Sequence, residues 1–527
     1  MNNNNHLPND NLKGEGYGLD THPHPPSKDH GDSVDLGAKE NGLTQPPYLH
    51  EPQYMPGKWR IGTLLPAPKG SLPEDFDPYN HRAGIVKGAT TNAETLIHLM
   101  KGSLGTGMLA MPIAFKNAGI IDGLIGCALI SFIASYGMHQ LLRMQHHVAK
   151  QMGVPLIDYA DAMKHAVEGG PKGISWLSKP APYLVDFFLC SFQIGVCCIY
   201  VSFISNNLKQ ISDEFWIVLS LRTWFIITGA IILPLNQLRN LHHLSPLSTA
   251  GDFLVVGGLG VVFYYIFKDG LSLGSDVELI PENPFKGFAL FFGTLMTAVQ
   301  SIGVIVSLEN NMKQPADYRK PCGVFNIGMV FITCLYGFTG LVGYMKYGAA
   351  TQGSVTLNLP KTSILPVLVK LAFAFVILFT YPLQCFMPTD ILWRNYVRIH
   401  ITQKSRKWVY NTILRIVLVV FSVLVASLIP FLDLLISTVG AFSLPTVGIT
   451  FPAIMELSVF YKEKRLTTWI KIKCIALIIF GIFSMILCTY VCLFSISDAG
   501  PNTANPTQVF VGNLTATLTP SNTSRVA

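Results

Sequence analysis

The sequence predicts an all-α polytopic membrane protein with eleven transmembrane helices. Half of its 527 residues are hydrophobic and 13% are charged, against about 25% in an average soluble domain. The mean hydropathy is +0.40, and apolar runs of about 20 residues, the length that spans a bilayer's hydrocarbon layer, recur along the chain. A soluble core could not bury this much apolar surface, so the composition excludes a soluble enzyme, a fibrous protein and a disulfide scaffold.

The predicted membrane domain covers residues 91–495. Its eleven spans run roughly over 92–114, 120–142, 181–206, 216–235, 250–267, 286–308, 323–345, 363–388, 412–431, 433–454 and 471–494. Residues 1–90 are rich in Asn, His, Pro, Gly and Asp without sustained periodicity, which predicts a disordered N-terminal tail with no cleavable signal peptide. Residues 496–527 form a polar C-terminal tail.

Basic residues predict the orientation of the spans. With the N-terminus in the cytosol, the loops on that side carry more than twice as many Lys and Arg as the outer segments, as the positive-inside rule requires. The C-terminal tail is then extracellular or lumenal, and its sequons at Asn513 and Asn522 could be glycosylated. The basic residues are scattered, which argues against nucleic-acid binding, and no cysteine pair has the spacing of a zinc site.

The first predicted span contains an interruption. It opens with Thr91-Asn-Ala-Glu94, a capping-box pattern. Small and hydroxyl residues then follow at membrane depth, namely Gly102, Ser103, Gly105, Thr106 and Gly107. Non-helical backbone at this depth is tolerated where it lines a cavity or is buried in protein, and the freed N–H groups suit a carboxylate. Close helix packing through small residues is the alternative.

The sixth predicted span has a weaker interruption at Gln300, Ser301 and Gly303. Paired interruptions in corresponding spans of two halves indicate a transporter of inverted repeats, with its site between them near the midplane. Spans one to five and six to ten would be the halves, and span eleven would be an extra C-terminal helix. Helix packing is again the alternative.

His98 is the candidate proton carrier, because an ionisable group inside a span is costly and imidazole titrates at mildly acidic pH. Glu94 and Lys101 lie one turn away on the same helix. A neutral histidine hydrogen-bonded between helices is an equal alternative. Asp186, near a span end, is interpreted as a solvated or capping carboxylate, and Lys370 as a snorkelling residue.

Several motifs are specific enough to indicate a family. The most specific is TLIHLMKGSLGTGMLAMPIAFKNAG over 95–119; others are FFGT at 291–294, LENNMK at 308–313, YGA at 347–349, GSVTLNLP at 353–360 and FTYPLQ at 379–384. Together they resemble the proton-assisted amino acid transporters of the amino acid/auxin permease family. The resemblance spans about residues 85–495. It implies eleven spans, a cytosolic N-terminus, a LeuT-like five-plus-five inverted repeat and symport of small neutral amino acids with protons. It places the family's proton-sensing histidine on His98 and its broken first helix on 102–107.

Two features depart from the family pattern. The family has Glu-Gly in the sixth span, where this chain has Gln300-Ser301, which changes the charge and backbone freedom beside the expected site. Lys361 stands where a disulfide cysteine of some members would be expected.

The sequence therefore predicts a secondary active transporter working by alternating access, and not an enzyme. Its expected partners are small neutral amino acids and the lipid bilayer, with the proton as coupling ion and no other cofactor or metal. One alternative is an amino acid uniporter, exchanger or sodium-coupled carrier, which the loss of the acid at Gln300 favours. Another is an amino acid sensor that signals through partners of the N-terminal tail. Either the plasma membrane or an endolysosomal membrane fits.

Overall fold

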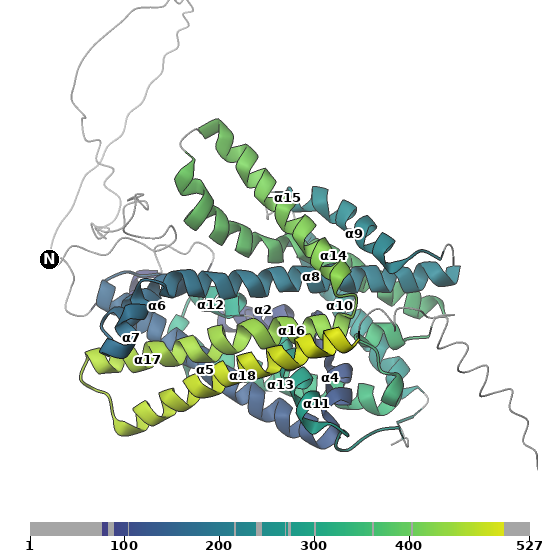
Figure 1. The fold of residues 1–527 in the computed structure, drawn as a ribbon, viewed down its shortest axis with the longest axis horizontal. Coiled ribbons are helices and arrows are strands. Elements are labelled where there is room, and N and C mark those ends of the chain that lie inside the picture. The colour runs from purple at the N-terminus through teal and green to yellow at the C-terminus, as the bar shows by residue number, and fades with distance from the viewer. Residues whose placement is uncertain are drawn as a thin grey trace, which may run out of the picture. The chain divides into compact units, whose positions relative to one another are not determined.

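A computed structural model describes residues 76–82, 89–103, 105–215, 218–238, 245–268, 270–271, 276–299, 302–360, 363–401 and 404–499. Over these ranges the chain is helical, apart from loops and one isolated β-bridge between Thr90 and Met312. The predicted all-α membrane architecture is thus confirmed (Figure 1). Both glycosylation sequons lie outside the described residues.

The first apolar segment is broken into α2 (Asn92–Ser103), α3 (Thr106–Leu109) and α4 (Met111–Ala118). The capping box is confirmed at its start, because the Thr91 N–H donates to Glu94 Oε2 at 2.8 Å and the Glu94 N–H donates to Thr91 Oγ1 at 3.4 Å. Gly105 is extended, with φ −138° and ψ −158°. The predicted interruption is therefore present at Gly105.

Six further helices complete the first half. They are α5 (Ile120–Met152), α6 (Tyr159–Glu168), α7 (Lys172–Ser175), α8 (Ala181–Phe215), α9 (Leu221–Asn236) and α10 (Ser245–Phe267). A short helix, α1 (Pro78–Arg82), precedes them within the predicted tail. Its Tyr79 donates to Glu309 Oε1 at 2.5 Å, and the Tyr79 ring lies 4.1 Å from the His146 ring of α5, so this end of the tail contacts the membrane domain.

The second half begins with a pair of helices, α11 (Pro284–Val299) and α12 (Ile302–Asn310). Gln300 and Ser301, between them, lie outside the described residues. The pair is followed by α13 (Val324–Tyr347), α14 (Ile364–Leu392), α15 (Lys404–Leu428), α16 (Leu432–Pro445), α17 (Phe451–Lys462) and α18 (Thr468–Asp498). A π-helical turn, η8 (Thr446–Thr450), joins α16 to α17.

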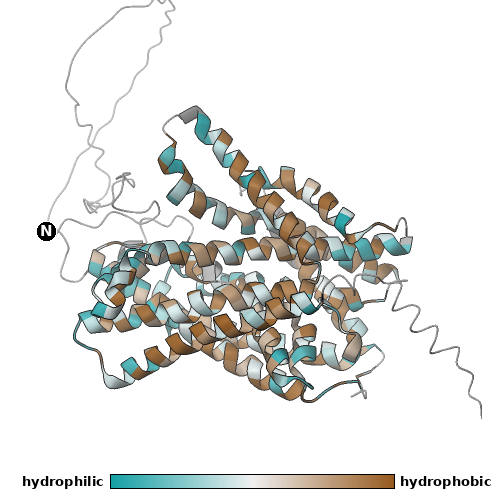
Figure 2. Ribbon diagram, in the orientation of Figure 1, coloured by the Kyte–Doolittle hydropathy of each residue, from teal (hydrophilic) through white to brown (hydrophobic). Residues whose placement is uncertain are grey.

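Seven described helices are long and apolar enough to cross a bilayer, and three shorter apolar helices cover 221–236, 253–267 and 284–299. The count of eleven spans stays a prediction, although every predicted span coincides with a helix or an adjoining set of helices. Large apolar side chains point outward on many helices, for example Val256 on α10, Val420 on α15 and Ile479 on α18, each more than half exposed. Apolar residues run along these helices in Figure 2, as expected for surfaces that face lipid.

Glycines allow other helices to pack closely against α11. A Cβ on Gly107 of α3 would lie 2.6 Å from Ala298 Cα of α11, and one on Gly440 of α16 would lie 2.0 Å from the Gly293 carbonyl oxygen. The Tyr336 hydroxyl of α13 donates to the carbonyl of Ser103 and, at 3.1 Å, to that of Ala298. The interrupted first segment is therefore packed directly against α11.

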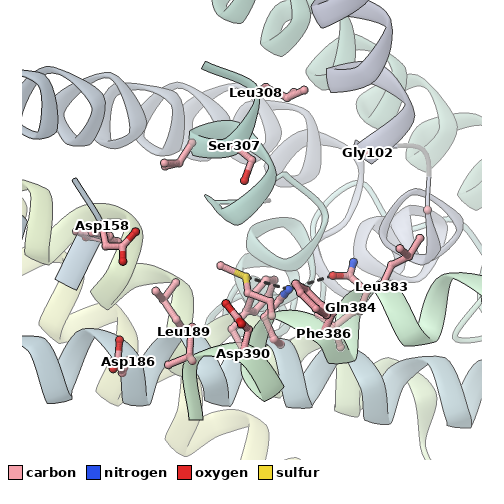
Figure 3. A pocket seen from close by; sticks show the side chains of 18 of the residues that line it. Gly102, Asp158, Asp186, Leu189, Ser307, Leu308, Leu383, Gln384, Phe386 and Asp390 are labelled. Atoms are coloured by element: carbon pink, nitrogen blue, oxygen red, sulfur yellow. Dashed lines mark hydrogen bonds between the residues drawn. The ribbon is translucent and has the colours of Figure 1, made fainter. Parts of the chain in front are cut away.

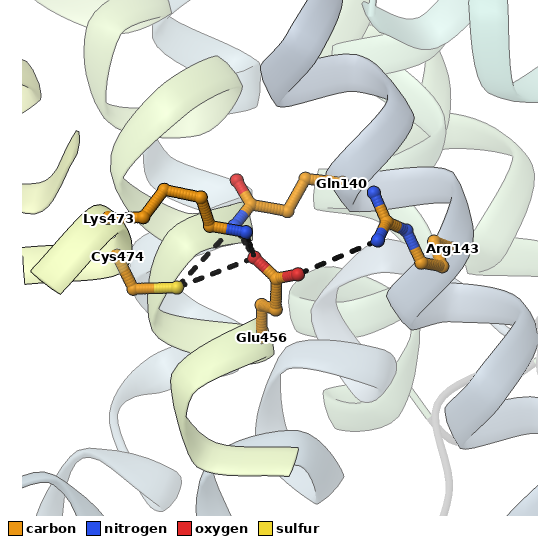
Figure 4. Close-up of polar contacts among 5 residues, drawn as sticks. All are labelled: Gln140, Arg143, Glu456, Lys473 and Cys474. Carbon is orange, nitrogen blue, oxygen red and sulfur yellow. Dashed lines mark hydrogen bonds and ion pairs between the residues drawn. The ribbon is translucent and has the colours of Figure 1, made fainter. Parts of the chain in front are cut away.

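One buried carboxylate joins α5, α17 and α18 (Figure 4). Glu456 is 1% exposed; its Oε2 accepts from Lys473 Nζ at 2.7 Å and from Gln140 Nε2, and its Oε1 lies 3.7 Å from Arg143 Nη1. The Cys474 thiol is 3.4 Å from Oε2. Such a charge is tolerable inside a protein because cations and donors surround it.

Lys370 differs from the snorkelling residue expected from the sequence. It is 1% exposed, and its Nζ donates to the Leu359 carbonyl oxygen at 3.4 Å. The 3₁₀ turn at Val355–Asn358 and the carbonyl that follows it lie against the outer half of α14. The ammonium is therefore bound by protein backbone instead of reaching bulk water.

Candidate substrate cavity

A cavity of about 620 Å³ lies beside the break in the first segment. Its walls come from α2, α3, α6, α8, α11, α12 and α14. In Figure 3, Ser307 of α12 lies across the cavity from Asp390 and Gln384 of α14, and Gly102 lies near the end of α2. A cavity among helices at mid-membrane depth is the expected place for a transporter's site.

The five predicted site residues of the first segment all line this cavity, namely Gly102, Ser103, Gly105, Thr106 and Gly107. The Ser103 hydroxyl donates to the Leu99 carbonyl of its own helix at 3.0 Å. The helix restarts at Thr106, and the first N–H groups of a helix have no partner within that helix. The segment therefore offers backbone donors where it meets the cavity.

The predicted site residues of the sixth segment are described only in part. Gln300 and Ser301 lie outside the described residues, and Gly303 belongs to α12 with no described surroundings. Their neighbours on both sides line the cavity, with Thr297 and Ala298 before them and Val306 and Ser307 after them. The sixth segment thus borders the cavity, while a binding role for Gln300, Ser301 and Gly303 stays a prediction.

His98 lies on an exposed part of α2, beside Ile97, which is 53% exposed. It is not among the residues that line the cavity, whose α2 contribution begins at Gly102. A proton-carrying role for His98 therefore stays a prediction, and His98 would have to act from outside the cavity wall.

The cavity extends to the predicted cytosolic side. Its lining there includes Asp158 before α6, Asp186 at the start of α8, and Asp390 at the end of α14. Asp390 Oδ1 is 2.7 Å from Arg394 Nε. No residue of the predicted outer loops is among those that line the cavity in the described chain.

Asp186 is more deeply placed than its position in the sequence suggested. It is 4% exposed, and its Oδ2 accepts from Asn395 Nδ2 at 3.1 Å and from the Tyr396 hydroxyl at 3.0 Å. We expected a solvated or capping carboxylate, because a residue near a span end usually faces water. The π-helical turn over Trp393–Val397, which continues α14, supplies both of these donors.

Sequence reasoning missed three polar residues on the wall opposite the break. Gln193 Nε2 of α8 donates to Gln384 Oε1 of α14 at 3.0 Å, and Gln384 Nε2 donates to the Tyr200 hydroxyl at 3.3 Å. All three line the cavity. The available signal was their polarity within long apolar runs, near the centre of the third span for Gln193 and within the FTYPLQ motif for Gln384.

Comparison with known proteins decides the class. Residues 88–497 match the family described as transmembrane amino acid transporter protein. The chain belongs to this family. It is an integral membrane protein of a transporter family, with amino acids as the substrate class, and not an enzyme.

Two relatives show how far the likeness extends. The proton-coupled amino acid transporter-like protein pathetic of Drosophila melanogaster is 30% identical over 461 residues, which cover 86% of this chain and 96% of that protein. The amino acid transporter AVT3B of Arabidopsis thaliana is 26% identical over 386 residues, covering 70% and 86%. This family member therefore spans nearly the full length of these transporters.

Solved structures give a weaker likeness. An inward-facing structure of Mhp1 is similar with a TM-score of 0.45 and 15% identity, covering 80% of this chain and 90% of that one. A manganese transporter of Eremococcus coleocola gives a TM-score of 0.45 and 14% identity, covering 85% and 93%. Family membership here rests on the sequence matches.

Proposed function

We propose that this family member is a proton-coupled symporter that moves small neutral amino acids into the cytosol by alternating access. The observation that supports the proposal most is the cavity beside the Gly105 break, which extends to the predicted cytosolic side. A site accessible from one side at a time is the requirement for alternating access.

The two ends of an amino acid would meet the two interrupted segments. Its carboxylate would lie near the backbone donors between Gly102 and Gly107, where a helix restarts and its dipole favours an anion. Its ammonium would lie near carbonyl groups around Gln300, Ser301 and Gly303. The cavity residues Thr297 and Ser307, on either side of that stretch, support this placement.

Two groups are candidates for the coupling proton. His98 is the candidate from the sequence, and Asp186 is the candidate from the structure because its carboxyl borders the cavity. A proton would be the only coupling ion, and no other cofactor would be needed. One pH unit supplies about 1.4 kcal/mol and a charge crossing about 100 mV supplies about 2.3 kcal/mol, enough together for accumulation of several hundredfold.

Voltage-clamp recording in cells expressing the protein tests the proposal. Glycine, alanine or proline is added in sodium-free solution at an external pH of about 5.5 and about 7.5. An inward current that grows at acid pH is expected. Amino acid uptake without current despite surface protein would favour exchange or uniport and would refute electrogenic proton symport.

Paired variants separate the two proton candidates. His98→Gln and Asp186→Asn keep size and remove the titratable group, and the variant that abolishes acid stimulation at equal surface abundance identifies the carrier. Asp122→Asn, on the outer end of α5 and away from the cavity lining, serves as a matched control. Full acid stimulation in both test variants would refute both assignments.

A sensing role is the second candidate, and the contact between Tyr79 and Glu309 favours it. Glu309 is 4% exposed, at the end of α12, next to the cavity residue Asn310. A cytosolic partner of the tail could therefore sense the state of the cavity, in the plasma membrane or in an endolysosomal one. Deleting residues 1–75 should then abolish nutrient signalling while uptake persists; signalling that survives the deletion would exclude this role for the tail.

A further inference from the structure

The cavity wall opposite the helix break carries a polar relay in otherwise apolar surroundings. The relay consists of Gln193, Gln384 and Tyr200, joined by hydrogen bonds of 3.0 and 3.3 Å. Its neighbours on the same wall include Leu189, Val196 and Ile199. Polar side chains at this membrane depth are costly, which makes them a functional hypothesis by default.

The relay leaves one hydrogen-bonding atom of Gln193 for the cavity. Gln193 Nε2 is engaged by Gln384 Oε1 and by Met387 Sδ at 3.4 Å. Gln193 Oε1 has no hydrogen-bond partner among the described residues and is not enclosed. Because Gln193 lines the cavity, this acceptor is available to a bound molecule.

The relay leaves one atom of Gln193 for the cavity whichever way its hydrogen bonds run. If both amides are turned over and the Tyr200 hydroxyl becomes the donor, every relay contact persists and Gln193 presents an N–H group to the cavity instead. The wall can thus offer an acceptor or a donor. A saturated hydrocarbon side chain would be disfavoured at this wall, because it would cover the amide without forming a hydrogen bond to it.

From this arrangement we infer that the relay selects neutral amino acids whose side chains carry a hydroxyl or an amide. The inference rests on the proposed transport function and deepens it. With the carboxylate and ammonium held by the interrupted segments, the side chain points to the wall formed by α8 and α14. Threonine would be preferred to valine and asparagine to leucine, which are pairs of nearly equal size.

The competing structural interpretation is that the relay only joins α8 to α14. The two interpretations differ in what a variant changes. A purely structural relay affects the amount of folded protein and leaves the threonine-to-valine ratio alone. A selective relay changes that ratio in the protein that reaches the membrane.

Competition uptake with the full chain tests the inference. The wild type is expected to favour threonine over valine by about tenfold, the effect of one hydrogen bond inside a protein. Gln193→Leu should reduce that ratio to about one while transport of valine persists. Gln151→Leu makes the same substitution on α5 outside the cavity and should leave the ratio unchanged.

Failure of the inference is distinguishable from failure of the proposed function. If the wild-type protein reaches the cell surface but takes up no amino acid, the proposed function itself is refuted. Uptake with equal rates for threonine and valine, or a ratio unaltered in Gln193→Leu, would overturn the selective relay. If Gln193→Leu does not reach the membrane, Gln193→Met removes the same amide at nearly constant volume, and the same ratio decides.

Discussion

Two polar clusters inside the membrane domain have opposite characters. In the Glu456 cluster, a carboxylate that is 1% exposed has partners on both oxygens, and cations come from Arg143 and Lys473. In the relay, Gln193 keeps one atom without a partner and faces a cavity. The difference teaches that a buried charge paired with cations holds helices together, whereas a polar atom without a partner beside a cavity can recognise a ligand.

The largest effect is expected from a substitution of Lys473 in the Glu456 cluster. Lys473→Met removes the nearer cation and leaves the buried Glu456 carboxylate with Arg143, 3.7 Å away, as the remaining cation of the cluster. Breaking such a pair costs about 3 kcal/mol or more, so thermal stability in detergent should fall clearly. Specific transport per folded molecule should stay the same.

A double variant is the control for this effect. Lys473→Met combined with Glu456→Met removes both charges and should recover most of the lost stability, because an apolar pair needs no compensation. If the double variant is as unstable as the single one, packing and not charge pairing holds α17 to α18.

A substitution of Gly107 tests the helix packing beside the cavity. A Cβ there would lie 2.6 Å from Ala298 Cα, which is backbone and cannot move aside. Gly107→Val should therefore separate α3 from α11 and reduce uptake at least tenfold while the protein still reaches the membrane. Gly260→Ala on α10, where a Cβ meets open space, should transport normally; equal loss in both variants would contradict the packing argument.

The smallest effect is expected at Asp317, in the 3₁₀ turn between α12 and α13. A hydrogen bond from Lys320 and a second from Asn92 lower the pKa of this carboxyl below its ordinary value. A depressed pKa means that the ion pair persists as pH falls through the ordinary range for Asp and is lost only below the lowered value. Asp317→Asn should therefore leave acid stimulation between pH 7.5 and 5.5 unchanged in uptake assays, and a shifted profile would make Asp317 part of the proton response.

The sequence predicted the features that depend on local chemistry. The capping box at Thr91 and Glu94 and the break at Gly105 were readable because caps and glycines act on the adjacent backbone. The relay was not readable, because Gln193 and Gln384 are 191 residues apart and meet only when α8 packs on α14. Asp186 was misjudged for the same reason, since its covering residues Asn395 and Tyr396 are remote in sequence.

The carboxylates that line the cavity have a consequence for chemical probes. Asp158 and Asp390 line the cavity at its predicted cytosolic end. If that end faces the cytosol, as the basic residues predict, a blocker shaped for it would first have to cross the bilayer or be delivered inside the cell. Such a compound would hold the carrier in one half of its cycle and would compete with amino acid on the inner side, while amino acid supplied outside would not displace it directly.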